Sequence, residues 1–258
     1  MIDVEQARRL YQGAEAVHDF DHVLRVLALA ERLARAEGAD LEIVRVAALL
    51  HDAARGSRPQ PVIASEPPLR AKQSPADEVE MASSPQGGAP RNDSLSSGED
   101  CLAPRESARY DEPAGYDHAH AGAELARRLL AGHPPDRVEA VAHAIAAHRF
   151  RGGPAPATIE ARVLHDADKL DAIGAIGVAR AFHYGGHWGQ RLWAEVPPDY
   201  QETPETAAEH TPVHEYVFKL ARIRERLLTD SARALAEERH AFMVAFYERL
   251  DREARGLA

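Results

Sequence analysis

The chain has 258 residues, a formal net charge of −10, 45% hydrophobic residues and a single cysteine. The acidic balance excludes general binding to nucleic-acid backbones, which requires a basic face, and one cysteine cannot form a disulfide within the chain. No run of about 18 apolar residues is present to cross a membrane, and the N-terminal residues lack the apolar core of a signal peptide. We therefore expect a cytoplasmic protein that binds no membrane.

Helix-forming residues dominate the chain outside one central segment. Ala, Leu, Arg and Glu lose little side-chain freedom in a helix. Alternating runs of β-branched and aromatic residues, the pattern of strands, are nearly absent. The sequence therefore predicts an all-α fold.

Three helices are predicted ahead of residue 56. A short helix covers residues 3–10, and a second begins at Asp19 or Asp21, either of which can cap it, and ends at Gly38. The third helix covers residues 41–53 and is apolar on most of its sides, which is typical of a central, buried helix.

Residues 56–115 have a different composition from the rest of the chain. They are rich in Pro, Ser, Gly and Glu and show no apolar periodicity. Such a segment cannot bury enough apolar surface to offset the entropy lost on ordering. We interpret it as a long disordered insertion within a single domain that spans residues 1–258, and not as a second domain.

Helical patterns resume at residues 117–118. The first helix after the insertion is expected to end at Gly132, the Pro134–Pro135 pair opens the next one, and Thr158 is a good cap for a third. The remaining helices are predicted over residues 158–174, 175–186, 214–228 and 230–255.

Two histidines are predicted to point into the core beside a carboxylate. His22 lies one turn before Val26 on the apolar stripe of the second helix. His51 and Asp52 lie in the last turn of the buried third helix. A carboxylate is costly to bury without a partner, whereas a divalent cation would neutralise it and accept the imidazole lone pair.

Three acidic residues crowd one and a half turns of the helix predicted over residues 158–174. Asp168 lies three residues before Asp171 on one side of this helix, and Asp166 lies on an adjacent face. Like charges at this density repel one another unless a cation, or the neighbouring Lys169, offsets them. The pattern again favours a bound cation.

The order His22, His51–Asp52, Asp168 resembles the H…HD…D signature of the HD superfamily of metal-dependent phosphohydrolases. The segments AALLHDAAR, AIAAHRF and HDADKLDAIGAIGVARAF look like a bacterial HD subfamily implicated in nucleotide pyrophosphate hydrolysis. The resemblance covers about residues 15–55 and 116–255. The insertion departs from the resemblance, because the subfamily has a much shorter link there. The resemblance therefore does not imply the shape of the pocket mouth.

The resemblance implies a helical bundle around one metal site and a role for each matched residue. The implied metal ligands are His22, His51, Asp52 and Asp168. Two imidazoles and two carboxylates suit a transition metal better than Ca²⁺, so we expect manganese first, with magnesium, iron, cobalt, nickel or zinc as alternatives. The residues implied in catalysis are Asp52, Asp168 and Asp171, while Asp166 or a histidine is an alternative for orienting the water or taking its proton.

Further residues are expected to contact the substrate. His118 and His148 both face the interior; phosphate contact is the favoured role, with ligation of a second metal or simple core packing as alternatives. Arg55 and Lys169 are the favoured phosphate clamps because they lie beside the ligand motifs. Less favoured basic residues are Arg180, Lys219 and Arg239.

The predicted activity is hydrolysis of (deoxy)nucleoside triphosphates to monophosphate and pyrophosphate. The same metal chemistry also fits a 5′-nucleotidase or a phosphodiesterase, since the pocket decides which phosphate bond is cleaved. Two other classes stay open: a non-catalytic nucleotide-binding module and an oxygenase with two irons. The expected partner is a nucleotide or another small phosphorylated substrate, and the sequence leaves open whether the chain forms a homodimer.

Overall fold

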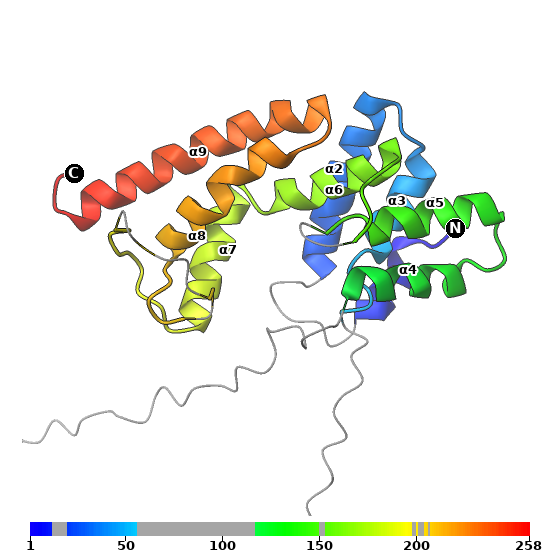
Figure 1. The fold of residues 1–258 in the computed structure, drawn as a ribbon, viewed down its shortest axis with the longest axis horizontal. Coiled ribbons are helices and arrows are strands. Elements are labelled where there is room, and N and C mark those ends of the chain that lie inside the picture. Colours follow the sequence, from blue (N-terminus) through cyan, green and yellow to red (C-terminus); the bar gives the residue numbers. More distant parts are fainter. Residues whose placement is uncertain (12–19, 56–116, 150–152, 198–199, 201–203, 206) are drawn as a thin grey trace, which may run out of the picture. The chain divides into compact units, whose positions relative to one another are not determined.

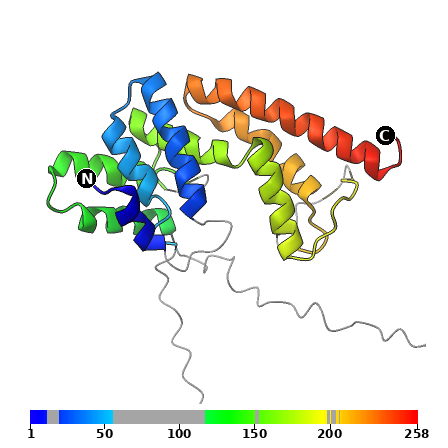
Figure 2. The same cartoon turned by 180° about the vertical axis from the view of Figure 1, so that it is seen from behind.

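The computed structural model describes residues 1–11, 20–55, 117–149, 153–197, 200, 204–205 and 207–258 (Figures 1 and 2). Within these ranges the chain forms helices and no strand, as the sequence predicts. The predicted insertion and the alternative cap Asp19 lie outside the described residues. No helix of the described part has both the length and the apolar character needed to cross a bilayer.

The described helices follow the chain as α1 (Val4–Arg8), η1 (Arg9–Tyr11), α2 (Phe20–Glu37), α3 (Leu41–Leu50), α4 (His118–Leu129), α5 (Pro135–Ala146), α6 (Ile159–Asp171), α7 (Gly174–His187), α8 (Pro212–Phe218), η3 (Leu220–Arg226) and α9 (Asp230–Ala254). Most of the predicted helix starts are confirmed, whereas α3, α4 and α6 end at Leu50, Leu129 and Asp171, ahead of the predicted ends at residues 53, 132 and 174. Asp117 caps α4, Pro135 occupies the first turn of α5, and the Thr158 side chain accepts a hydrogen bond from the Ala161 amide at the start of α6.

Helices α2, α3, α5 and α6 pack against one another and form the core around the site. Helix α2 contacts α3 and α6, and α3 also contacts α5 and α6 (Figure 1). Helix α3 is buried on most sides, with Val44, Ala47, Ala48 and Leu50 fully buried. This burial agrees with the apolar character from which a central helix was predicted, and it brings the C-terminal end of α3 between α2 and α6.

The closing part of the chain differs from the prediction. The helix predicted over residues 214–228 is instead a short α8 followed by the 3₁₀ helix η3. Leu220 and Ile223 are both buried and are three residues apart, which is the spacing that aligns side chains on one face of a 3₁₀ helix. Helix α9 then packs against α7 and α6.

Asp40 offers a test of how the N-terminal end of α3 is held. Its side chain accepts hydrogen bonds from the amides of Glu42 and Ile43, and Arg137 of α5 donates to it at 3.0 and 3.1 Å. The hydrogen bond from Arg137 lowers the pKa of Asp40 below its ordinary value. A carboxylate with a depressed pKa contributes stability above its unfolded-state pKa, and this contribution is lost as the pH falls through its folded-state pKa.

We therefore expect Asp40→Ala to lower the free energy of unfolding by about 1 kcal/mol at neutral pH, with the difference shrinking below about pH 4. Urea unfolding at pH 7 and at pH 3 measures both values. Asp40→Asn serves as the control, since its remaining oxygen keeps the cap while the charge and one of the two acceptors of Arg137 are lost. A loss of equal size at both pH values would contradict this account.

Candidate metal centre

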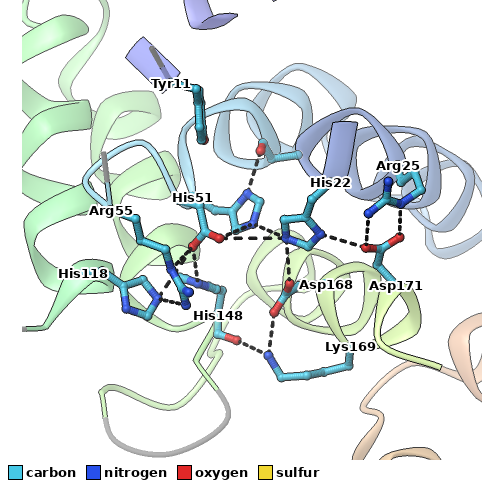
Figure 3. Close-up of polar contacts among 12 residues, drawn as sticks. Tyr11, His22, Arg25, His51, Arg55, His118, His148, Asp168, Lys169 and Asp171 are labelled. Atoms are coloured by element: carbon cyan, nitrogen blue, oxygen red, sulfur yellow. Dashed lines mark hydrogen bonds and ion pairs between the residues drawn. The ribbon is translucent and has the colours of Figure 1, made fainter. Parts of the chain in front are cut away.

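His22 and Asp168 meet where α2 crosses α6. His22 lies in the first turn of α2 and is buried, one turn before the fully buried Val26. Its Nε2 atom is 3.4 Å from Oδ1 of Asp168, which projects from the last turns of α6 (Figure 3). The contact joins two residues that are far apart in the sequence.

His51 and Asp52 lie just beyond α3 and not inside its last turn. Helix α3 ends at Leu50, and His51 Nδ1 donates to the Ala48 carbonyl oxygen at 2.8 Å. This bond fixes the imidazole, so that His51 Nε2 faces His22 Nε2 at 3.3 Å (Figure 3). Two ring nitrogens at this distance need a proton or a cation between them, because two lone pairs would repel.

Asp52 faces both histidines with one of its oxygens. Its Oδ2 atom is 3.9 Å from His22 Nε2 and 3.7 Å from His51 Nε2, and the side chain is almost fully buried. Ligand atoms of His22, His51 and Asp168 all lie within 4.8 Å of one another. The two histidines and Asp52 are buried and Asp168 is partly exposed. Two imidazoles and two carboxylates match the ligands that divalent transition metals take in proteins, so these residues fit a metal ion.

The other oxygen of Asp52 belongs to a second cluster. Asp52 Oδ1 is 3.7 Å from His118 Nε2 and 3.8 Å from His148 Nε2, and these three residues form a second group with metal-ligand spacing. Both histidines are buried, as their helix positions predicted. Asp52 thus lies between two groups of potential ligands and offers one oxygen to each.

The electrostatics of the cluster favour anionic carboxylates and two neutral histidines. Although burial acts in the opposite direction, positive charge nearby, from Arg55 and Lys169 respectively, holds the pKa of Asp52 and of Asp168 well below the ordinary value. Burial lowers the pKa of His118 to about 3 and that of His148 to about 4. Neutral imidazoles and ionised carboxylates are the forms that bind metals.

His22 behaves differently from these two histidines. Burial alone would lower its pKa, but hydrogen bonds with Asp168 and Asp171 raise the pKa of His22 to about 9. The raised pKa favours the protonated form of His22, whose Nε2 atom is one of the atoms that would ligate a metal. Binding of a cation there must displace this proton.

Asp171 holds His22 from the side opposite the cluster. Asp171 Oδ2 accepts from His22 Nδ1 at 2.8 Å, and Arg25 donates to both oxygens at 2.7 and 3.1 Å (Figure 3). Arg180 also donates to Asp171 Oδ2, at 3.3 Å. A carboxylate bound to the second ring nitrogen of a metal-binding histidine fixes the tautomer and orientation of that ring.

From this geometry we expect Asp171→Asn to weaken metal binding by about 10–100-fold. At saturating metal, turnover should fall much less than metal affinity does. Titration of the metal-free variant by calorimetry gives the affinity, and Asp136→Asn, at an exposed position of α5, is the control. Unchanged affinity with a large loss of turnover would instead assign Asp171 to the reacting water.

Of the other acidic and basic residues named from the sequence, Lys169 lies at the centre, whereas Asp166, Lys219 and Arg239 bond to residues outside the ligand set. Asp166 accepts hydrogen bonds from the residues that precede α9. Lys169 donates to Asp168 Oδ2 at 2.7 Å and to the His148 carbonyl oxygen at 2.9 Å, which places it at the centre. Lys219 pairs with Glu205 and Glu215, and Arg239 donates to the Leu170 carbonyl oxygen.

Sequence reasoning missed Arg25 at the centre. It lies one turn after His22 on α2, and this i, i+3 spacing was the available signal. A basic residue on a helix usually faces water, and only the packing of α2 against α6 shows that Arg25 reaches Asp171.

In the described part of the chain, helices bring two groups of His and Asp side chains around one shared carboxylate, Asp52. This arrangement defines a helical protein with a candidate metal centre. The family model described as HD domain matches residues 19–80 and 100–173 of the chain. The chain belongs to the HD domain family.

Known relatives extend the similarity over nearly the whole chain. The Bacillus subtilis protein YpgQ is 28% identical over 268 residues, which covers 100% of this chain and 98% of YpgQ. The crystal structure of YpgQ in complex with ADP is similar with a TM-score of 0.60 and 26% identity, covering 99% and 100% of the two chains. A predicted HD superfamily hydrolase from an uncultured Thermotogales bacterium has a TM-score of 0.54 and 25% identity, covering 97% and 90%.

Proposed function

We propose that the chain is a divalent-metal-dependent phosphohydrolase that converts (deoxy)nucleoside triphosphates to monophosphate and pyrophosphate. The observation that carries this proposal is the group of His22, His51, Asp52 and Asp168: ligand atoms of His22, His51 and Asp168 lie within 4.8 Å of one another, and Asp52 Oδ2 faces both histidines. The solved structures similar to this chain include proteins described as HD superfamily hydrolases. Manganese is the metal that we propose first.

Some residues of the centre would bind the metal, and others would contact the substrate. In this proposal His22, His51, Asp52 and Asp168 hold the cation, and Asp171 positions His22 through Nδ1. When bound, the cation supplies a Lewis acid for a phosphate oxygen and lowers the pKa of a water molecule. Asp52 and Asp168, with their lowered pKa values, keep the negative charge that orients this water by hydrogen bonding.

Positive charge for the phosphates comes from two basic residues that lie beside the ligand carboxylates. Arg55 and Lys169 lie against the two ligand carboxylates, Asp52 and Asp168, at 2.9 and 2.7 Å. A guanidinium is well suited to phosphate because its N–H groups form a fork. We propose that Arg55, Lys169, His118 and His148 contact the phosphates of the substrate.

The nucleotide part of the proposal is supported by a relative. YpgQ was crystallised in complex with ADP and is similar to this chain over its whole length. ADP contains the base, ribose and phosphoanhydride that a nucleoside triphosphate also has. This similarity favours a nucleotide over other phosphorylated substrates.

The test is a panel of substrates with Mn²⁺, from ribo- and deoxyribonucleoside triphosphates to monophosphates and a phosphodiester. Ion chromatography separates pyrophosphate from orthophosphate. We expect pyrophosphate and monophosphate in equal amounts from triphosphates. Orthophosphate from monophosphates would identify a 5′-nucleotidase, and cleavage of the diester alone would identify a phosphodiesterase. If a folded, metal-loaded chain turned over none of these substrates, the result would instead indicate a non-catalytic nucleotide-binding module.

A further inference from the structure

The side chain of Arg55 lies within the second group of potential ligands. Its Nε atom is 2.9 Å from Asp52 Oδ1, and one of its terminal nitrogens donates to His118 Nε2 at 3.0 Å (Figure 3). His148 Nε2 faces the same Asp52 oxygen at 3.8 Å. The guanidinium therefore contacts two of the three residues that a cation in this group would bind.

This group has the chemistry of a cation site in its own right. Asp52 Oδ1 is buried, and no well-aligned hydrogen bond reaches it from the described residues, although the Arg55 charge is close. The His148 ring donates through Nδ1 to the Ile145 carbonyl oxygen, which leaves its Nε2 lone pair directed toward Asp52. A carboxylate oxygen and two imidazole nitrogens would suit a second transition metal.

We propose that Arg55 serves as the built-in cation of this second group, so that the chain binds one metal ion at His22, His51, Asp168 and the Oδ2 atom of Asp52 and excludes a second. A guanidinium is always protonated and is tethered three residues from Asp52, so a free metal ion must displace a charge that is already in place. The excluded position is the one bounded by Asp52 Oδ1, His118 and His148.

The positive charge of Arg55 can also contact the phosphates of the substrate. In two-metal phosphohydrolases both ions neutralise the attacked phosphate. Here the side chain of Arg55 is 32% exposed, so part of its guanidinium remains open for hydrogen bonds to a phosphate while another part contacts Asp52. This step rests on the proposed function, whereas the exclusion of a second metal does not.

The test counts metal ions and needs no turnover. Metal-free protein is saturated with Mn²⁺, unbound metal is removed, and manganese per chain is measured by mass spectrometry together with the electron paramagnetic resonance spectrum. We expect about one ion per chain in the wild type and about two in Arg55→Met, which has a similar length and no charge. Two ions that share Asp52 should also show magnetic coupling, which is absent from a single-ion spectrum.

Three matched variants complete the experiment. Arg55→Lys keeps the charge and should stay at about one ion, and Arg55→Met combined with His148→Ala should return to about one. Arg45→Met, on the exposed side of α3, is the control for replacing an arginine outside the second group of ligands. If Arg55→Met does not fold, as judged by circular dichroism, Arg55→Gln replaces it.

Two results would overturn the proposal. One is a wild-type chain that binds two ions, since Arg55 would then exclude nothing. The other is a folded Arg55→Met or Arg55→Gln chain that still binds one. If the phosphohydrolase proposal alone were wrong, no product would form in the substrate panel, but the metal counts would still be as expected.

Discussion

If the proposed function holds, replacing Asp52 with alanine is expected to reduce pyrophosphate release from nucleoside triphosphates by at least about 10³-fold. Asp52 is the residue that both groups of ligands share, since Oδ2 faces His22 and His51 while Oδ1 faces His118 and Arg55. Its loss removes a metal ligand and also leaves the half-buried Arg55 charge without its carboxylate partner.

Metal affinity and turnover should be lost together in this variant. Calorimetric titration with Mn²⁺ measures the first, and ion chromatography of products measures the second. Asp52→Asn keeps the shape of the side chain and removes only its charge, so it separates the two contributions. Asp136→Ala, at an exposed position of α5, should change neither. If Asp52→Ala bound metal normally and kept turnover within tenfold of the wild type, Asp52 would have no place in the centre.

The helical framework could be predicted where a signal acts within one turn of the chain. Thr158 caps α6 through a hydrogen bond three residues along, and Pro135 begins α5 because its fixed backbone angle suits the first turn. The end of α8 was not predictable in this way. At the break, Lys219 pairs with Glu205, 14 residues earlier, and Leu220 is buried, so the residues around it also make contacts beyond one helical turn.

The site could be predicted in composition but not in contacts. Periodicity indicated that His22 points inward, because that depends only on the other residues of α2. The bond between His22 and Asp171 joins positions 149 residues apart, so no local pattern contains it. The same is true of Arg55, whose contact with His118 spans the insertion in the sequence.

Asp166 shows where a sequence motif gives too little information. It lies two residues before Asp168 in the same run of acids, and two residues correspond to a rotation of about 200° around a helix. The two carboxylates therefore point to different sides of α6. Asp168 faces His22, whereas Asp166 accepts hydrogen bonds from the amides of Leu228 and Thr229 and from the Thr229 hydroxyl.

Asp166 is consequently expected to matter more for stability than for chemistry. The carboxylate is completely buried and ties the start of α9 to α6, with the closest bonds, from Thr229, at 2.7 Å. Asp166→Ala leaves the Leu228 and Thr229 donors unpaired, at about 1–3 kcal/mol for each buried group. We therefore expect the free energy of unfolding to fall by about 3 kcal/mol or more, a large part of the 5–15 kcal/mol that is typical of a folded domain.

Urea unfolding of the metal-free protein measures this loss. Thr229→Val, which removes only the hydroxyl donor, should lower the free energy of unfolding by about 1 kcal/mol, and the double variant should lose less than the sum because the two groups share one contact. The folded Asp166→Ala chain should keep its Mn²⁺ affinity and its turnover within about threefold, since none of the bonds to Asp166 comes from a metal ligand. A small loss of stability combined with a collapse of turnover would instead make Asp166 the residue that acts on the water, and α9 would then be anchored without it.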